Sequence, residues 1–137
     1  MTSRQKVFDF MQEAGTLFIA TEDGKKPKVR PIGFKMMVDE QIYFVTGKNK
    51  DFSAQMLRNS NVEIACCVGP EFLRYYGRVE FDEDVDKTLY KEALKVMPQL
   101  EELMNEETGE AQIFHITKAT AEFHKMMQIE QTYNFLD

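Results

Sequence analysis

Four residues in the first half of the chain could together bind an anion. Arg30 lies in one predicted strand, while Thr46, Lys48 and Lys50 lie at the end of the next, where a short helix begins. If the turn at 39–40 pairs these strands, Ile32 faces 43–45 and Arg30 approaches the 46–50 loop. A hydroxyl, cationic side chains and the free amides of a helix N-terminus would then converge, which suits a phosphate. The pattern alone leaves an alternative, in which the lysines are solvated and Arg30 forms a surface ion pair.

Other familiar sites are not indicated by the sequence. It has neither the glycine-rich loop of dinucleotide-binding folds nor a P-loop. His115 and His124 lie nine residues apart without the further ligands of a zinc site. We interpret them as sheet histidines with water or backbone partners. The adjacent Cys66 and Cys67 would point to opposite faces of a strand, so we interpret them as small packed residues and not as a disulfide.

The composition is that of one ordinary globular domain, covering 1–137. Its formal net charge of -6 argues against non-specific binding to nucleic acid or to an anionic membrane surface. No apolar run approaches the roughly 20 residues that a membrane-spanning helix needs. The first residues lead into an amphipathic segment and not into the apolar block of a signal peptide. We therefore expect a cytoplasmic protein.

The elements that must position these residues are mostly short strands. A capping box at 2–5 predicts a helix that Gly15 ends, and Asp86 is predicted to cap a later helix that Pro98 disturbs. A short helix at 52–58 is expected to bury Met56 and Leu57. The tail is expected to begin after about 127. The predicted strands, joined by turns at 23–24 and 39–40, are 17–21, 28–38, 41–46, 62–68, 73–81, 113–116 and 120–126. About seven strands with tight hairpins indicate an antiparallel barrel or sandwich, the barrel being favoured.

Several of these segments, in order and spacing, resemble the small FMN-binding split-barrel proteins related to pyridoxamine 5'-phosphate oxidase. That group includes the nitroimidazole-resistance type flavoproteins and the general stress proteins. The resemblance runs from the opening helix to about Lys125. It is carried by Phe18-Ile19-Ala20-Thr21-x-Asp-Gly, Pro27-x-Val29-Arg30-Pro31-x-Gly33-Phe34, Ile42-Tyr43-Phe44-Val45-Thr46-x-x-x-Lys50, Asn59-x-Asn61-Val62-Glu63-Ile64, Tyr76-Gly77-Arg78-Val79-Glu80-Phe81 and Ile113-Phe114-x-Ile116. It implies a mainly β fold with flanking helices, an antiparallel split β-barrel.

The resemblance implies FMN as the cofactor and assigns ligands to its phosphate. Arg30 and Lys50 would bind the phosphate, and Lys48 is a weaker candidate. Lys35 matches in type a phosphate-binding lysine of the larger oxidases, although it lies on the opposite face of the strand from Arg30.

The resemblance also assigns residues to the flavin ring. Pro31 and Ile32 would offer backbone contacts along the isoalloxazine edge, and Val45 with Thr46 would line the same cofactor. In the larger oxidases a glutamine reaches the flavin of the partner subunit, and here that position falls near Phe72.

The function implied is that of an FMN-dependent oxidoreductase acting on a small organic substrate or electron acceptor. The chain is much shorter than the true oxidases and lacks the segment that holds the substrate phosphate there, so we do not expect vitamin B6 oxidation. Two alternatives stay open: a flavin- or small-ligand-binding module without turnover, and an acidic interaction protein without a cofactor.

The second predicted strand also indicates a homodimer. It carries apolar residues on both faces, with Ile32 and Phe34 on one and Val29 and Pro31 on the other. A strand of this kind needs cover on both faces, and the resemblance implies a two-fold partner with the flavin at the interface. The alternative is a monomer in which the opening helix covers the second face.

Overall fold

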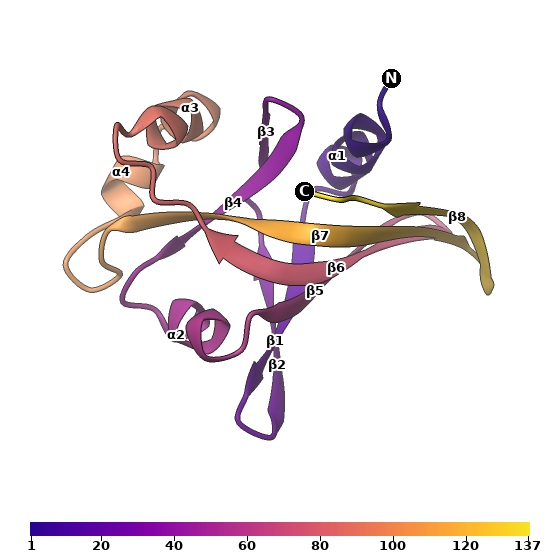
Figure 1. Ribbon diagram of the computed structural model, residues 1–137, viewed down its shortest axis with the longest axis horizontal. Coiled ribbons are helices and arrows are strands. Elements are labelled where there is room, and N and C mark those ends of the chain that lie inside the picture. Colours follow the sequence, from indigo (N-terminus) through magenta and orange to yellow (C-terminus); the bar gives the residue numbers. More distant parts are fainter.

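One antiparallel sheet of eight strands, flanked by four helices, makes up the protein in the computed structural model, which describes residues 1–137 (Figure 1). In chain order the elements are α1 Ser3–Ala14, β1 Leu17–Asp23, β2 Lys26–Ile32, β3 Met36–Val38, β4 Gln41–Gly47, α2 Asp51–Arg58, β5 Asn61–Val68, β6 Glu71–Phe81, α3 Thr88–Val96, α4 Leu100–Leu103, β7 Ala111–Lys125 and β8 Gln128–Asn134. No helix has the length and apolar character needed to cross a bilayer.

The sheet curls without closing. The strand order is β2-β1-β5-β6-β7-β4-β3, so β2 and β3 are its two ends. The long β7 pairs with β6 along one edge, while its other edge pairs first with β4 and then with β8. The predicted split barrel, mainly β with flanking helices, is therefore confirmed.

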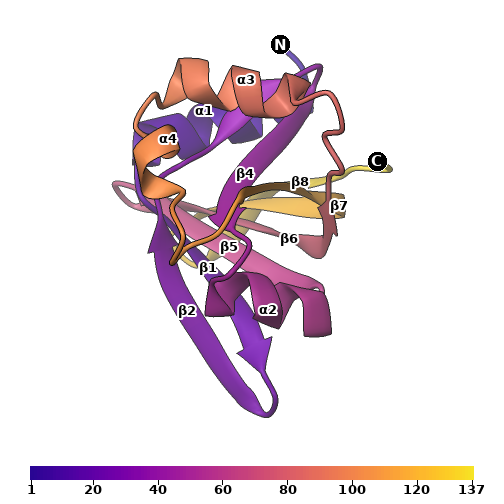
Figure 2. The same cartoon turned by 90° about the vertical axis from the view of Figure 1, so that its left-hand side faces the viewer.

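Strand alternation directs one face of the curled sheet inward. Eighteen buried residues from α1, α2 and five strands form the main core there, with Phe44, Tyr75 and Phe114 among the largest. A second, smaller core lies between β3, β4 and β7 on one side and α3 and α4 on the other, with Met36, Ala93, Leu100 and Ile113 fully packed. Figure 2 shows α3 and α4 at one end of the molecule, with α2 beside the protruding β1–β2 hairpin at the other.

The local signals near the N-terminus hold in the structure. The hydroxyl of Thr2 accepts from the Gln5 amide at 3.1 Å, and Gly15 ends α1 with a φ of 80°. The turn at 39–40 is also as predicted, because Asp39 and Glu40 both have positive φ, as a two-residue type I′ hairpin requires.

The predicted strand 28–38 is wrong as a single element. It is two strands, β2 and β3, separated by Gly33–Lys35, and they pair with different partners. Ile32 therefore pairs with Leu17 and not with 43–45, and Met36 faces Tyr43 instead. The chain leaves the ladder here because Lys35 turns inward and donates from Nζ to the carbonyl oxygens of Gly15 and Gly33.

Four further expectations need correction. The segments 113–116 and 120–126 are one strand, β7, and the expected tail from about 127 contains β8. Leu57 is 65% exposed, and the buried side of α2 is formed by Phe52, Ser53, Gln55 and Met56. Helix α3 takes its main cap from Asp84 and not from Asp86, since the Asp84 carboxylate accepts from two amides of its first turn.

Candidate functional site

Arg30 is held in a fixed position by the β1–β2 hairpin and by α2. In the hairpin register it lies opposite Ile19, so its side chain is on the inward face of the sheet. One guanidinium nitrogen donates to the Thr21 hydroxyl at 3.0 Å, and the other donates to Gln55 Oε1 at 2.7 Å. Thr21 and Gln55 are themselves joined by a 2.6 Å hydrogen bond and are buried, so this small network fixes the guanidinium.

The surroundings of the guanidinium preserve its charge. It lies 4.5 Å from the centre of the Phe52 ring, in a cation–π arrangement. Partial burial lowers the pKa of Arg30, and the nearby Asp51 carboxylate opposes that shift. An arginine stays protonated at neutral pH under such a change. It also has five N–H donors, more than Thr21 and Gln55 use.

A cavity of about 580 Å³ opens in front of Arg30. It lies where α2 begins, and the N-cap residue Lys50 gives that helix no side-chain cap. The amides of the first turn of α2 are therefore available to an anion. The lining residues are Asp23, Lys28, Arg30, Asn49, Lys50, Asp51, Phe52, Gln55, Glu107 and Thr108.

The predicted phosphate ligands are only partly brought together. Arg30 and Lys50 line the same cavity, as predicted, although β2 and β4 do not pair. Their proximity arises because α2 packs on β1, next to β2. Lys48 lines two neighbouring cavities instead. Lys35 is buried elsewhere, on the Gly15 and Gly33 carbonyls.

The residues predicted for the flavin ring are dispersed around this region and do not line the cavity. Ile32 lies on the same face of β2 as Arg30 and packs against the main core, whereas Pro31 is exposed on the other face. Val45 packs in the smaller core beneath α3 and α4. Thr46 is buried on the inward face, and its hydroxyl has no hydrogen-bond partner.

Sequence reasoning missed the residues that hold Arg30. Thr21 lies three residues before the hairpin turn at 24–25, and the turn register alone could have placed it on the same face as Arg30. Phe52 and Gln55 lie three residues apart, on one side of α2. Only the packing of α2 on β1 brings them to the arginine.

The other titratable groups also differ from expectation. Both histidines have carboxylate partners, not water or backbone: His115 Nδ1 is 2.9 Å from Asp82, and His124 Nε2 is 2.9 Å from Glu122. The hydrogen bond to Asp82 raises the pKa of His115. Of the two cysteines only Cys66 is buried.

Comparison with solved structures gives the same fold. A NimC/NimA family protein from Clostridium acetobutylicum superimposes with a TM-score of 0.85 at 24% identity, covering 98% of this chain and 95% of that one. General Stress Protein 26 from Bacillus anthracis gives 0.67 at 16% identity, with 98% and 100% coverage. A pyridoxamine 5'-phosphate oxidase-related, FMN binding protein from Nostoc punctiforme gives 0.66 at 12% identity, with 98% and 89% coverage.

Comparison of the sequence with family models identifies the family of this chain. No curated protein matches the chain. The family model described as pyridoxamine 5'-phosphate oxidase matches residues 3–125, which include the whole Arg30 cavity and every strand but β8. The protein therefore belongs to the pyridoxamine 5'-phosphate oxidase family.

Proposed function

We propose that this protein binds FMN, with the FMN phosphate in the cavity in front of Arg30. The observation that carries the proposal is the guanidinium fixed by Thr21, Gln55 and Phe52 at the uncapped start of α2. A phosphate there would meet a cation whose orientation is already set, so little side-chain entropy is lost on binding. The family membership and the FMN-binding relative from Nostoc punctiforme support flavin as the ligand.

The donor set of the cavity fits a phosphate. Arg30, Lys28 and Lys50 supply three cations, against Asp23, Asp51 and Glu107. Of these carboxylates, Asp23 is already paired with Arg58 at 3.0 Å. The cations therefore exceed the unpaired carboxylates, and the positive end of the α2 dipole adds to them. A phosphate ester can accept hydrogen bonds from the guanidinium, the ammonium groups and the helix amides together.

The proposed activity is that of an FMN-dependent oxidoreductase acting on a small organic substrate or electron acceptor. Bound FMN would supply the electron-transfer chemistry, while the protein sets orientation, access and potential. Arg30 and Lys50 would hold the phosphate end. Ile32 lies two residues after Arg30 on the same face of β2, so it is the predicted ring contact closest to the phosphate end along that face. Pro31, Val45 and Thr46 stay predictions for the remaining contacts.

A second copy of the chain is the proposed partner. Phe18 and Val29 are 48% and 68% exposed, and they share the outer face of β1 and β2 with Pro31. Helix α1 does not cover this face, because its Val7 and Met11 are packed in the main core. An exposed apolar sheet face of this kind is typical of an interface. We propose a homodimer with the flavin at the interface.

The test is the absorption spectrum of the protein purified with FMN present, followed by titration with FMN, riboflavin and FAD. We expect bound flavin, with FMN bound more tightly than riboflavin because only FMN carries the phosphate monoester. A colourless protein that binds none of them would refute the proposal. Catalytic reoxidation of the reduced, flavin-loaded protein by nitroaromatic or quinone acceptors would separate an oxidoreductase from a binding module. Light scattering of the loaded protein should give twice the chain mass of 16.0 kDa.

A further inference from the structure

Arg4 is a buried cation on α1. Figure 1 shows α1 beside the C-terminus and well separated from α2, where the Arg30 cavity lies. Its side chain is only 5% exposed. The guanidinium donates to both oxygens of the Asp137 carboxylate, at 2.9 and 3.2 Å, and to the Glu40 carbonyl at 2.9 Å. It also lies 4.2 Å from the centre of the Phe135 ring. The two-pronged contact to a carboxylate is the strongest geometry available to an arginine.

The two sides of this contact differ in how firmly they are held. Arg4 belongs to α1 and is enclosed by the barrel, whereas the Asp137 side chain is 75% exposed. The 135–137 segment is held by the Phe135 ring, which packs against the main core beside Tyr75, and by one backbone hydrogen bond, from the Phe135 amide to the Ala119 carbonyl. Gln41 Nε2 adds a long contact of 3.4 Å to the Asp137 main-chain oxygen. Leu136 is 93% exposed. The receptor is therefore built into the fold, and its carboxylate approaches from solvent.

Two buried polar groups beside the carboxylate make no hydrogen bond with Asp137. The Arg4 Nε and the Tyr75 hydroxyl lie close to each other, and neither has a well-formed hydrogen bond to any other group. Tyr75 is 0% exposed, and burial raises its pKa to about 12 against the opposing charge of Arg4, so the hydroxyl keeps its proton. Unsatisfied buried donors are uncommon in folded proteins and call for an explanation. A ligand that reaches deeper than the Asp137 side chain would supply one.

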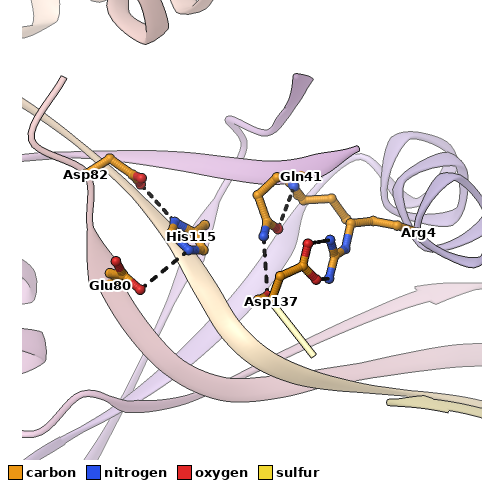
Figure 3. Close-up of polar contacts among 7 residues, drawn as sticks. Arg4, Gln41, Glu80, Asp82, His115 and Asp137 are labelled. Carbon is orange, nitrogen blue, oxygen red and sulfur yellow. Dashed lines mark hydrogen bonds and ion pairs between the residues drawn. The ribbon is translucent and has the colours of Figure 1, made fainter. Parts of the chain in front are cut away.

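We propose that Arg4, Gln41 and Tyr75 form a carboxylate-binding site, which Asp137 fills as an internal ligand and which a small free monocarboxylate can enter in its place. The 135–137 segment is then a strap that such a ligand releases. Figure 3 shows the acidic pair Glu80 and Asp82 around His115 on the side next to this contact. These carboxylates disfavour a ligand with a second negative charge. The site is independent of flavin.

Chemical rescue tests this proposal in the full-length chain. Asp137→Gly removes a CH₂COO⁻ group, and acetate returns the same atoms. We expect sodium acetate to raise the melting temperature of Asp137→Gly in a saturable way, by on the order of 5 °C well above the dissociation constant, relative to sodium chloride at equal ionic strength. Leu136→Gly, which removes an exposed neighbour, should give no acetate-specific rise. In the wild type, excess acetate should increase hydrogen exchange of the Phe135 amide.

The dependence on Arg4 completes the test. Adding Arg4→Met to Asp137→Gly should abolish the acetate-specific rise in melting temperature. Glycolate should bind to the Asp137→Gly variant at least as tightly as acetate does. An equal response of Asp137→Gly, Leu136→Gly and the double variant would overturn the proposal. If Asp137→Gly does not fold, Asp137→Asn provides the same comparison, because its neutral amide holds Arg4 less strongly. None of these outcomes depends on whether the protein binds FMN.

Discussion

Replacing Arg30 with alanine should weaken FMN binding much more than riboflavin binding. A hydrogen bond between charged groups contributes about 1.5–3 kcal/mol, which corresponds to a loss of roughly 10- to 150-fold in FMN affinity. Riboflavin lacks the phosphate but presents the same ring. Its affinity therefore reports any damage to the rest of the site, and the difference between the two ligands isolates the phosphate contact.

The variant should remain folded, because the network around Arg30 partly survives its removal. Gln55 Oε1 keeps the 2.6 Å hydrogen bond from Thr21, while the charged contact and the stacking on Phe52 are lost. These losses amount to about 1–3 kcal/mol of stability, which a urea titration would show.

Isothermal titration of both ligands is the assay, with Arg78→Ala as the matched control. Arg78 is exposed on β6, its side chain donates a hydrogen bond to the Ser60 hydroxyl, and its removal should change neither affinity. An equal fold-loss for FMN and riboflavin in Arg30→Ala would refute the phosphate assignment. It would leave Arg30 as a purely structural residue.

Two further predictions concern the scaffold. Gly47→Ala should lower the free energy of unfolding by about 1–3 kcal/mol, because the added Cβ would lie 2.4 Å from the Thr108 carbonyl oxygen. Gly33→Ala is the control: its Cβ would meet nothing within 4 Å, so it should be near neutral in the same urea titration. Asp82→Asn should cost more stability at pH 5.5 than at pH 8.5. The pKa of His115 is raised in the folded protein, so the His115–Asp82 pair stabilises the fold fully below the unfolded-state pKa of His115, about 6.5, and this stabilisation is lost as pH rises through the folded-state pKa. Equal losses at the two pH values would contradict this.

Local signals in the sequence predicted the hairpins but not the length of their strands. The first turn lies at 24–25, one residue later than predicted, and the second lies at 39–40 as predicted. Both depend on residues that tolerate positive φ, and Gly24, Asp39 and Glu40 all adopt it. The break at Gly33–Lys35 depends instead on Lys35 reaching the Gly15 carbonyl, twenty residues away in sequence. A pattern of apolar residues cannot show such a contact, so the two strands were predicted as one.

The candidate site was predictable to a similar extent. The types and positions of Arg30 and Lys50 indicated an anion site, and the structure places both on one cavity. The predicted reason was wrong, since β2 pairs with β1 and never with β4. The correct reason, α2 packing on β1, joins segments that no local pattern connects. The family resemblance anticipated the fold because it uses the whole order of elements and not one hairpin.

The cap of α3 gives a direct test of where local sequence reasoning fails. Asp86, two residues before the helix, is the predicted cap, yet the one helix amide that it accepts from is that of Thr88, at 3.2 Å. Asp84 accepts from the Leu89 and Tyr90 amides at 2.8 and 2.9 Å, because Lys87 takes a φ of 60° and folds the chain back. Asp84→Ala should therefore cost about 1 kcal/mol, the usual value for a lost helix cap. Asp86→Ala should leave the urea midpoint close to the wild type. If Asp86→Ala is instead the more harmful change, the capping scheme given by the structure is wrong.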